Sequence, residues 1–262
     1  MGDVTLNILI IGDIVGEIGV KKAKDVIGQM KQNHKIDFVI ANAENSAEGM
    51  GITANIYKDL ISNGVNVITM GNHTWGKKEI FNIIDNKEII RPANYPQGVQ
   101  GRGYDIYECK GKKIAVINLI GRVDMNVLSE NPFLTVEKIV EEIEEKTDII
   151  IVDFHAEATA EKIAMGYFLD GKVTCVYGTH THVQTADETI LENGTAYITD
   201  VGMTGPKKSV IGMDVDVSVK RFVTTLPERY RISSDKRTIC NGCLIKINDD
   251  NCRVIEINRI NM

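Results

Sequence analysis

Short apolar runs rich in β-branched residues alternate with helical patterns through the first seventy residues, and this alternation limits the fold more than any other feature. Residues 6–11, 38–41 and 67–70 are such runs and predict buried strands. Between them, residues 20–33 carry apolar side chains at helical spacing, and residues 53–62 end at an Asn-Gly stop. Strands that alternate with helices form a sheet covered by helices. The chain is therefore predicted to be an α/β protein.

The middle of the chain continues this mixed pattern. Residues 104–109 and 113–118 predict a hairpin, and Asn131-Pro132 is typical of a helix that begins with proline. Residues 149–177 then predict a strand, a helix and a second strand.

The last third of the chain is predicted to be mostly β-structure. Asn193-Gly194 lies between two apolar runs and indicates a type I′ hairpin, and residues 240–258 indicate another hairpin. No repeat, linker or low-complexity tract interrupts the pattern. We therefore expect residues 1–262 to form a single domain.

The charge of the chain argues against polyanionic partners. Thirty Lys and Arg against 36 Asp and Glu give a formal charge of −6, so we expect no stable nucleic-acid complex. The amino terminus, Met1 to Asp3, lacks a basic leader region, and no apolar run approaches the ~18 residues of a membrane span. Together with an odd number of cysteines, five, these features predict a soluble cytoplasmic protein with no membrane partner.

Acids, amides and histidines follow the predicted strands. Because the carboxyl ends of parallel strands share one rim of a sheet, such side chains can meet in one crevice. Four of the five histidines belong to this set, whereas His34 falls at a predicted helix end. These side chains bind divalent first-row metals, so the rim is a predicted metal site. In chain order the candidates are Asp13, Glu44, Asn45, Asn72, His73, His155, His180 and His182.

The spacing of His180 and His182 suggests two metals. In an extended segment, residues two apart point to the same side, so both imidazoles are expected to face one cavity with one histidine for each metal. Glu44 is able to bridge two cations, and Asn45 offers a neutral oxygen beside it. The many oxygen donors favour Mn or Fe over a zinc site built on Cys and His.

Two other kinds of site are disfavoured. The glycines at 12, 16 and 19 follow a strand, but their spacing does not match a dinucleotide-binding loop. Cys240 and Cys243 form one isolated Cys-x-x-Cys within a predicted hairpin, where buried thiols pack as small apolar groups.

Several segments together resemble one bacterial family. They are Gly12-Asp13-Ile14-Val15-Gly16, Asn42-Ala43-Glu44-Asn45, Gly71-Asn72-His73-Thr74-Trp75, residues 153–159 and 178–187, and the shorter stretches 91–96, 101–104 and 200–206. In these segments the chain resembles the YmdB-type metallophosphoesterases, a branch of the calcineurin-like superfamily, over nearly its whole length. Val15 stands where the wider superfamily usually has histidine, and Asn-Ala-Glu-Asn replaces that superfamily's second motif.

The resemblance implies a four-layer αββα sandwich with a dinuclear metal site at the sheet edge. Two divalent or mixed-valence ions are expected, with Fe or Mn preferred and Zn or Mg as further options. One metal would take Asp13, Asn45 and His182, the other would take Asn72, His155 and His180, and Glu44 would bridge them. His73 would remain unligated.

The activity implied by the resemblance is that of a 2′,3′-cyclic-nucleotide 2′-phosphodiesterase, with a small phosphoester as substrate. A bridging hydroxide would attack phosphorus, and His73 would donate the leaving-group proton. The alternative is a regulatory protein that contains metal and senses a nucleotide with little turnover. Arg91, Asn94, Tyr95 and Arg102 either contact phosphate or base, or fix loops. The resemblance also implies a homo-oligomer.

Overall fold

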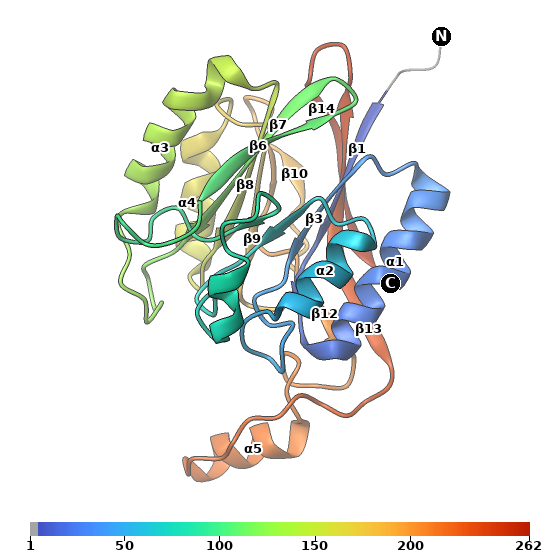
Figure 1. The fold of residues 1–262 in the computed structure, drawn as a ribbon, viewed down its shortest axis with the longest axis vertical. Helices are drawn as coiled ribbons and strands as arrows, with labels where there is room; N and C mark the ends of the chain where they lie inside the picture. The colour runs from blue at the N-terminus through green and yellow to red at the C-terminus, as the bar shows by residue number, and fades with distance from the viewer. Residues whose placement is uncertain (1–4) are drawn as a thin grey trace.

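Two mixed β-sheets form the centre of the protein in a computed structural model that describes residues 5–262 (Figure 1). Met1 to Asp3, on which the expected absence of a leader region depends, lie outside the described residues. Within the described chain the larger sheet has eight strands. One of them, β14 (Val254–Asn261), pairs only with β13 (Thr238–Asn248) and lies outside the order of the other strands. The order of the other seven is β2 (Asp13–Ile14), β12 (Met203–Pro206), β13 (Thr238–Asn248), β1 (Thr5–Ile11), β3 (Phe38–Asn42), β4 (Val67–Thr69) and β5 (Ile89–Ile90).

The smaller sheet has six strands among the residues that the structure describes. Their order is β10 (Thr189–Ile190), β11 (Ala196–Ile198), β9 (Cys175–Thr179), β8 (Ile149–His155), β7 (Lys112–Ile120) and β6 (Tyr104–Cys109). The central strands β7, β8 and β9 are parallel, and β6 returns antiparallel to β7 as the hairpin pattern predicts. The larger sheet likewise has β1, β3, β4 and β5 in parallel and β13 antiparallel to β1. The predicted α/β class is therefore confirmed.

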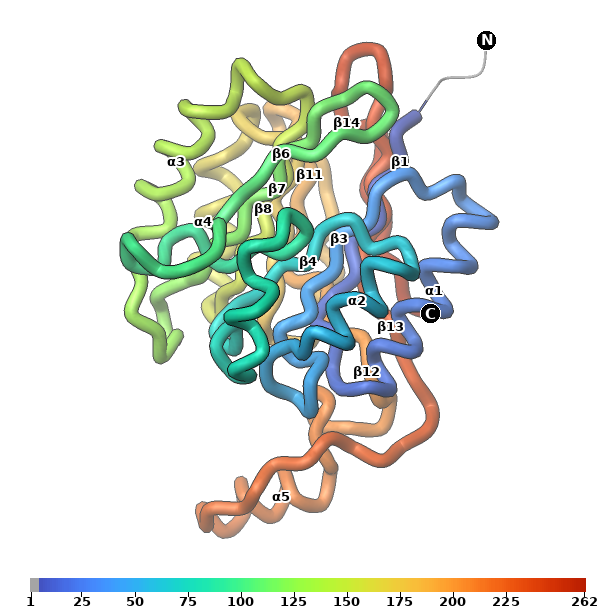
Figure 2. Tube along the Cα trace, viewed as in Figure 1, coloured from blue at the N-terminus to red at the C-terminus, as the bar shows by residue number. Residues whose placement is uncertain are grey.

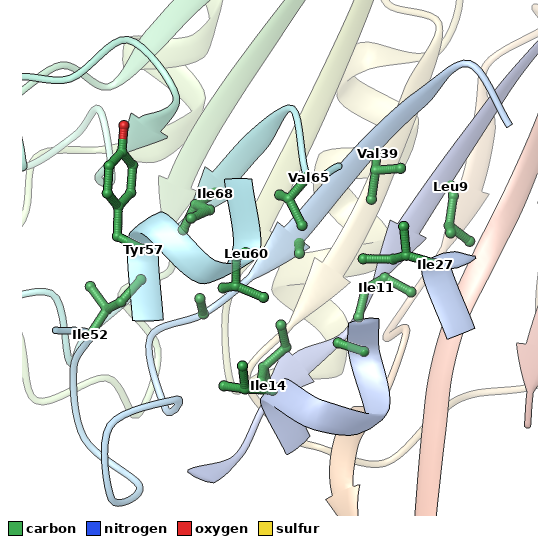
Figure 3. Packing of buried hydrophobic residues seen from close by; sticks show 14 of the residues in the cluster. Leu9, Ile11, Ile14, Ile27, Val39, Ile52, Tyr57, Leu60, Val65 and Ile68 are labelled. Atoms are coloured by element: carbon green, nitrogen blue, oxygen red, sulfur yellow. The ribbon is translucent and has the colours of Figure 1, made fainter. Parts of the chain in front are cut away.

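Helices cover the outer faces of the two sheets. On the larger sheet lie α1 (Gly16–His34) and α2 (Ala54–Ser62), whose apolar side chains join those of β1 and β3 in one cluster (Figure 3). On the smaller sheet, α3 (Pro132–Ile143) and α4 (Thr159–Leu169) share a cluster with β7 and β8. A third cluster holds residues of both sheets, so their inner faces pack against each other. Short 3-10 helices, η1 (Lys78–Asn82) and η2 (Glu144–Lys146), complete the body.

Most predicted boundaries agree with the structure, and the local reasons are visible. Asn131 caps α3 by accepting hydrogen bonds from the backbone N–H groups of Phe133 and Leu134, and Pro132 is the first helical residue. Cys240 and Cys243 are free, buried thiols that belong to different apolar clusters on the two faces of β13. Three positions apart on a strand they point to opposite faces, so they do not form a site together.

Two features of the last third differ from the sequence analysis. The type I′ turn is wrong, because only Gly194 of the Asn193-Gly194 pair has a positive φ, 101°, and the loop closes from Leu191 to Thr195. The helix α5 (Val215–Thr224) was not expected, although its cap Asp214 accepts from the backbone N–H of Val217 as a sequence signal would suggest. It lies on a segment that extends from the two sheets (Figures 1 and 2). No helix among residues 5–262 is long and apolar enough to cross a membrane.

Candidate metal centre

The structure brings all eight candidate residues together, and it draws them from both sheets. Asp13 begins β2, and the pairs at 44–45 and 72–73 follow β3 and β4 of the larger sheet. His155 ends β8, and His180 and His182 follow β9 of the smaller sheet. The strand ends predicted to share a rim therefore form one site between two sheets.

Glu44, Asn72, His155 and His180 form the first group of contacts. His155 Nε2 lies 2.9 Å from Asn72 Oδ1, 3.1 Å from Glu44 Oε1 and 3.1 Å from His180 Nδ1. Ligand atoms of Glu44, His155 and His180 all lie within 4.8 Å of one another. Gly71 borders this group, and a side chain there would strike both His155 and Glu44.

Asp13, Asn45 and His182 form the second group, and Glu44 joins it to the first. His182 Nε2 lies 3.2 Å from Asn45 Nδ2 and 3.8 Å from Asp13 Oδ1. Asn45 Nδ2 also lies 3.4 Å from Glu44 Oε1. The backbone N–H of His180 donates to Asp13 Oδ2 at 3.1 Å, which ties the two groups together.

A hydrogen-bond chain behind His155 determines which ring nitrogen faces the centre. The hydroxyl of Thr179 donates to Asp153 Oδ1 at 2.7 Å, so its oxygen accepts from His155 Nδ1 at 2.9 Å. This leaves His155 Nε2 as the ring nitrogen directed at the oxygens of Asn72 and Glu44. Burial raises the pKa of Asp153 to about 6. Because this value is still below neutral pH, the carboxylate is mostly ionised there and accepts hydrogen bonds.

The other two imidazoles are held in the same way. His180 Nε2 lies 3.1 Å from Glu157 Oε2, and His182 Nδ1 donates to the carbonyl of Ile211 at 2.8 Å. Each of the three rings therefore has one nitrogen bonded to an outer acceptor and the other turned toward the centre. Metal-ligating histidines have this arrangement because the outer partner fixes the tautomer and the ring orientation.

The donor set fits divalent cations. Around His155 Nε2, two oxygens and a second imidazole nitrogen all present lone pairs within 3.1 Å, which one proton cannot satisfy. Asp13 Oδ1 is fully buried and has no hydrogen-bond partner among residues 5–262. A buried carboxylate oxygen without a partner is costly unless a cation neutralises it.

The charges of these groups are strongly coupled. Burial alone would raise the pKa of Glu44, but His155 and His73 outweigh it and lower that pKa to about 2. Burial would likewise lower the pKa of His155, whereas Glu44 raises it to about 9. Burial together with His155 lowers the pKa of His180 to about 3, and burial raises the pKa of Asp13. Without metal, a single proton shared by Glu44 and His155 is therefore favoured at neutral pH.

His73 lies at the border of the site and faces solvent on one side. Its backbone N–H donates to Glu44 Oε2 at 2.8 Å, and its Nδ1 lies 2.7 Å from Asn45 Oδ1. The amide oxygen accepts from Nδ1 of the ring, and among residues 5–262 no hydrogen bond is formed by Nε2. The side chain is 31% exposed and lines an open cavity of about 530 Å³.

The extended geometry expected for His180-Thr181-His182 is wrong. His180 and His182 have φ values of 98° and 64°, in the left-handed region that favours glycine. Asp200 Oδ2 holds this turn, since it accepts from both the backbone N–H and the hydroxyl of Thr181 at 3.1 and 2.7 Å. The two histidines reach the same site through a tight turn and not through a shared strand face.

A buried ion pair supports the turn and was not found by sequence reasoning. Lys162 of α4 donates to Asp200 Oδ2 at 2.6 Å and to the carbonyl of Thr179 at 2.7 Å. Lys162 and Asp200 have side chains that are only 2% and 1% exposed. A lysine within a helical pattern gave no signal of this role, because nothing in the chain order shows that it points inward.

Four residues are open to two interpretations, contact with phosphate or base and the fixing of loops. In this structure all four make hydrogen bonds within the protein. The guanidinium of Arg91 donates to backbone carbonyls at Pro92, Val99, Gln100 and Gly101. Asn94 bonds backbone groups of residues 120 and 130, Tyr95 donates to the carbonyl of Gly71, and Arg102 pairs with Asp105. Each of these four side chains therefore bonds other parts of the protein.

The chain is similar to known proteins over nearly its whole length. The 2′,3′-cyclic-nucleotide 2′-phosphodiesterase of Bacillus subtilis (strain 168) is 48% identical over 256 residues, which cover 97% of this chain and 96% of the relative. A crystal structure described as a novel phosphatase of Mycoplasma pneumoniae is 36% identical with a TM-score of 0.93, and the match covers 99% of this chain and 94% of that one. The NAD nucleotidase of Haemophilus influenzae is only 12% identical with a TM-score of 0.59, covers 98% of this chain and 56% of that one, and shares the fold alone.

The family assignment rests on nearly the whole length of the chain. The model of the family described as YmdB-like protein matches residues 9–260, which include every candidate site residue. This match and the identity to the Bacillus subtilis relative confirm the resemblance seen in the sequence motifs. The chain belongs to the YmdB-like protein family.

Proposed function

We propose that this protein hydrolyses 2′,3′-cyclic nucleotides at the 2′ ester bond, with two metal ions in the candidate centre. The observation that carries the proposal is the orientation of three imidazoles, each bonded outward at one nitrogen and turned toward Glu44 and Asp13 at the other. Glu44 contacts both groups of side chains described above, through His155 of the first group and Asn45 of the second. One metal would be held by Asp13, Asn45 and His182, the other by Asn72, His155 and His180, with Glu44 between them.

Oxygen donors in both groups favour Mn or Fe in these positions. Asn45 would serve through Oδ1, since the amide nitrogen has no lone pair to offer a metal; in this structure Oδ1 accepts from His73 and Nδ2 faces His182, so metal binding would need this side chain to turn. A pair of divalent cations, when bound, supplies a nucleophile at neutral pH and offsets charge on the phosphoryl oxygens.

His73 is the residue of this chain that we assign to proton transfer. Hydrolysis adds water to phosphorus and breaks the bond to the 2′ oxygen, which needs a proton as it leaves. Asn45 and Glu44 hold the His73 ring and backbone, the side chain lines the cavity, and no other described residue bonds its Nε2. A positioned imidazolium of this kind contributes about 10²- to 10⁴-fold to rate.

The relatives support the reaction class. The Bacillus subtilis relative is named a cyclic-nucleotide phosphodiesterase, and the Mycoplasma pneumoniae structure is described as a phosphatase. The three apolar clusters, one between the sheets and one under each pair of helices, support assignment of the fold to the four-layer αββα sandwich.

The test is turnover of 2′,3′-cyclic AMP by the purified protein before and after chelation, followed by readdition of Mn²⁺. We expect adenosine 3′-monophosphate as the product, loss of activity with chelator and recovery with metal. Phosphorus NMR distinguishes the 3′ from the 2′ product. Tight binding of the nucleotide without product, in metal-loaded protein, would contradict the proposal and favour the nucleotide-sensing alternative.

A further inference from the structure

Residues 207–237, here called the arm, leave the two sheets and return to them as two adjacent segments, and α5 lies on the arm (Figures 1 and 2). The outgoing and returning segments bond each other: the backbone N–H of Lys207 donates to the carbonyl of Arg237 at 2.8 Å, and that of Asp214 donates to Arg231 at 2.9 Å. The arm is therefore a built element with its own backbone pairing.

The root of the arm is attached to the candidate metal centre. His182 donates to the carbonyl of Ile211, which belongs to the outgoing segment. A Cβ atom added at Gly49, in the loop after Glu44, would lie 3.2 Å from Met213 Cε of the arm. The arm thus packs against the same loop that carries Glu44.

A single cavity of about 530 Å³ runs from the metal centre to the arm. His73, His180 and His182 line one end, and Met50, Phe222 and Tyr230 line another part. This volume suits one small ligand that has both a charged and an apolar part.

The apolar part is made of exposed aromatic and thioether side chains. Phe222 is 76% exposed and Tyr230 is 43% exposed, although both are large and apolar. The guanidinium of Arg221 lies 4.5 Å from the centre of the Tyr230 ring and steadies it by a cation–π contact. Flat rings and polarizable sulfur bind the faces of planar heterocycles.

We propose that the arm forms the base subsite of the enzyme, in which the nucleobase of the substrate packs against Phe222 and Tyr230. The inference rests on the proposed function, since it assumes that the cyclic phosphate lies at the histidine end of the same cavity. Stacking uses the ring face that every base has, so the subsite accepts both purines and pyrimidines. It distinguishes nucleotides from phosphoesters that lack a base.

The experiment compares two substrates and three proteins. The substrates are 2′,3′-cyclic AMP and the base-free 2′,3′-cyclic phosphate of methyl riboside. The proteins are the wild type, the double variant Phe222→Ala/Tyr230→Ala, and the control Val223→Ala, which changes a neighbouring residue of equal exposure, 76%, that does not line the cavity. Calorimetric titration of the Mn²⁺-loaded proteins with adenosine 3′-monophosphate, the expected product, gives a readout that does not depend on turnover.

We expect the double variant to lose about 5- to 150-fold in kcat/KM for 2′,3′-cyclic AMP, as stacking of one base implies. Its kcat/KM for the base-free substrate and its Tm should stay near the wild-type values, and the titration should show weaker binding. Equal losses on both substrates, or no loss on either, would overturn the base subsite.

Failure of the proposed function gives a different pattern. A wild type that hydrolyses neither substrate refutes the phosphodiesterase activity, while the titration still decides the subsite. Weaker nucleotide binding by the double variant than by Val223→Ala would then support the subsite, and equal binding would overturn it.

Discussion

Replacement of Lys162 by methionine tests whether the buried ion pair holds the histidine turn. Methionine keeps most of the length of the side chain but removes the charge and both hydrogen bonds, to Asp200 and to the carbonyl of Thr179. Asp200 is 1% exposed, so its carboxylate would remain buried without its cation. Bonds from Thr181 and the backbone of Gly202 would still reach it but carry no compensating charge.

The cost follows from this burial. Loss of one partner from a buried ion pair destabilises proteins by about 3–5 kcal/mol, because the other charge stays in a medium of low dielectric constant. The double variant Lys162→Met/Asp200→Asn leaves no buried charge, so we expect it to recover part of that loss. A positive coupling energy in the double-mutant cycle would measure the pair itself.

Urea denaturation of the metal-free protein is the assay, with Lys21→Met as control because Lys21 is exposed on α1. We expect the control to change the free energy of unfolding by less than about 0.5 kcal/mol. Lys162→Met should also bind Mn²⁺ more weakly, since the turn that carries His180 and His182 loses its support. If Lys162→Met unfolds within 1 kcal/mol of the wild type and binds Mn²⁺ equally well, the reasoning is refuted.

Three further predictions concern the metal centre. His73→Ala should keep its metal yet lose about 10²- to 10⁴-fold in kcat, whereas His34→Ala should not; an unchanged kcat removes His73 from proton transfer. In metal-free protein the pKa of His155 is raised from 6.5 to about 9, so its stabilisation is complete below pH 6.5 and is lost as pH rises through 9. The free energy of unfolding should therefore fall by about 3 kcal/mol at most across this range, and a pH profile of His155→Gln equal to the wild type would contradict this. Mn²⁺ at 100-fold its Kd should raise Tm by about 5–10 °C, and less in Asp13→Asn; an equal reduction in the exposed-residue control Asp25→Asn would argue against a specific site.

Much of the fold could be predicted because local patterns and tertiary packing agree. The apolar stripe of residues 20–33 faces the larger sheet as its spacing requires, and the proline at 132 begins α3. The turn at Asn193-Gly194 could not be typed from the pair alone, since a longer loop with one left-handed glycine suits the same residues. The helix α5 differs from the predicted β-structure of the last third, and several of its apolar residues remain exposed, so no packing against a sheet within residues 5–262 accompanies it. A single domain, a homo-oligomer and a cytoplasmic location stay predictions from the sequence.

The candidate site could be located from the chain because its residues follow strands, and strand ends converge. What surrounds them could not be derived. The turn at 180–182 depends on Asp200, and the partner of that acid, Lys162, comes from a helix on the far side of the sheet. Long-range contacts of this kind leave no periodic signal, so only the structure shows them.

Seven residues from two sheets are proposed to hold a pair of cations, with His73 beside them. Anomalous diffraction from crystals grown with Mn²⁺ tests this proposal most directly. We expect two peaks, one on each side of Glu44. One should lie beside Asp13 and His182, and the other beside His155 and His180. An absence of peaks there, at a Mn²⁺ concentration that restores turnover to chelated protein, would contradict the account.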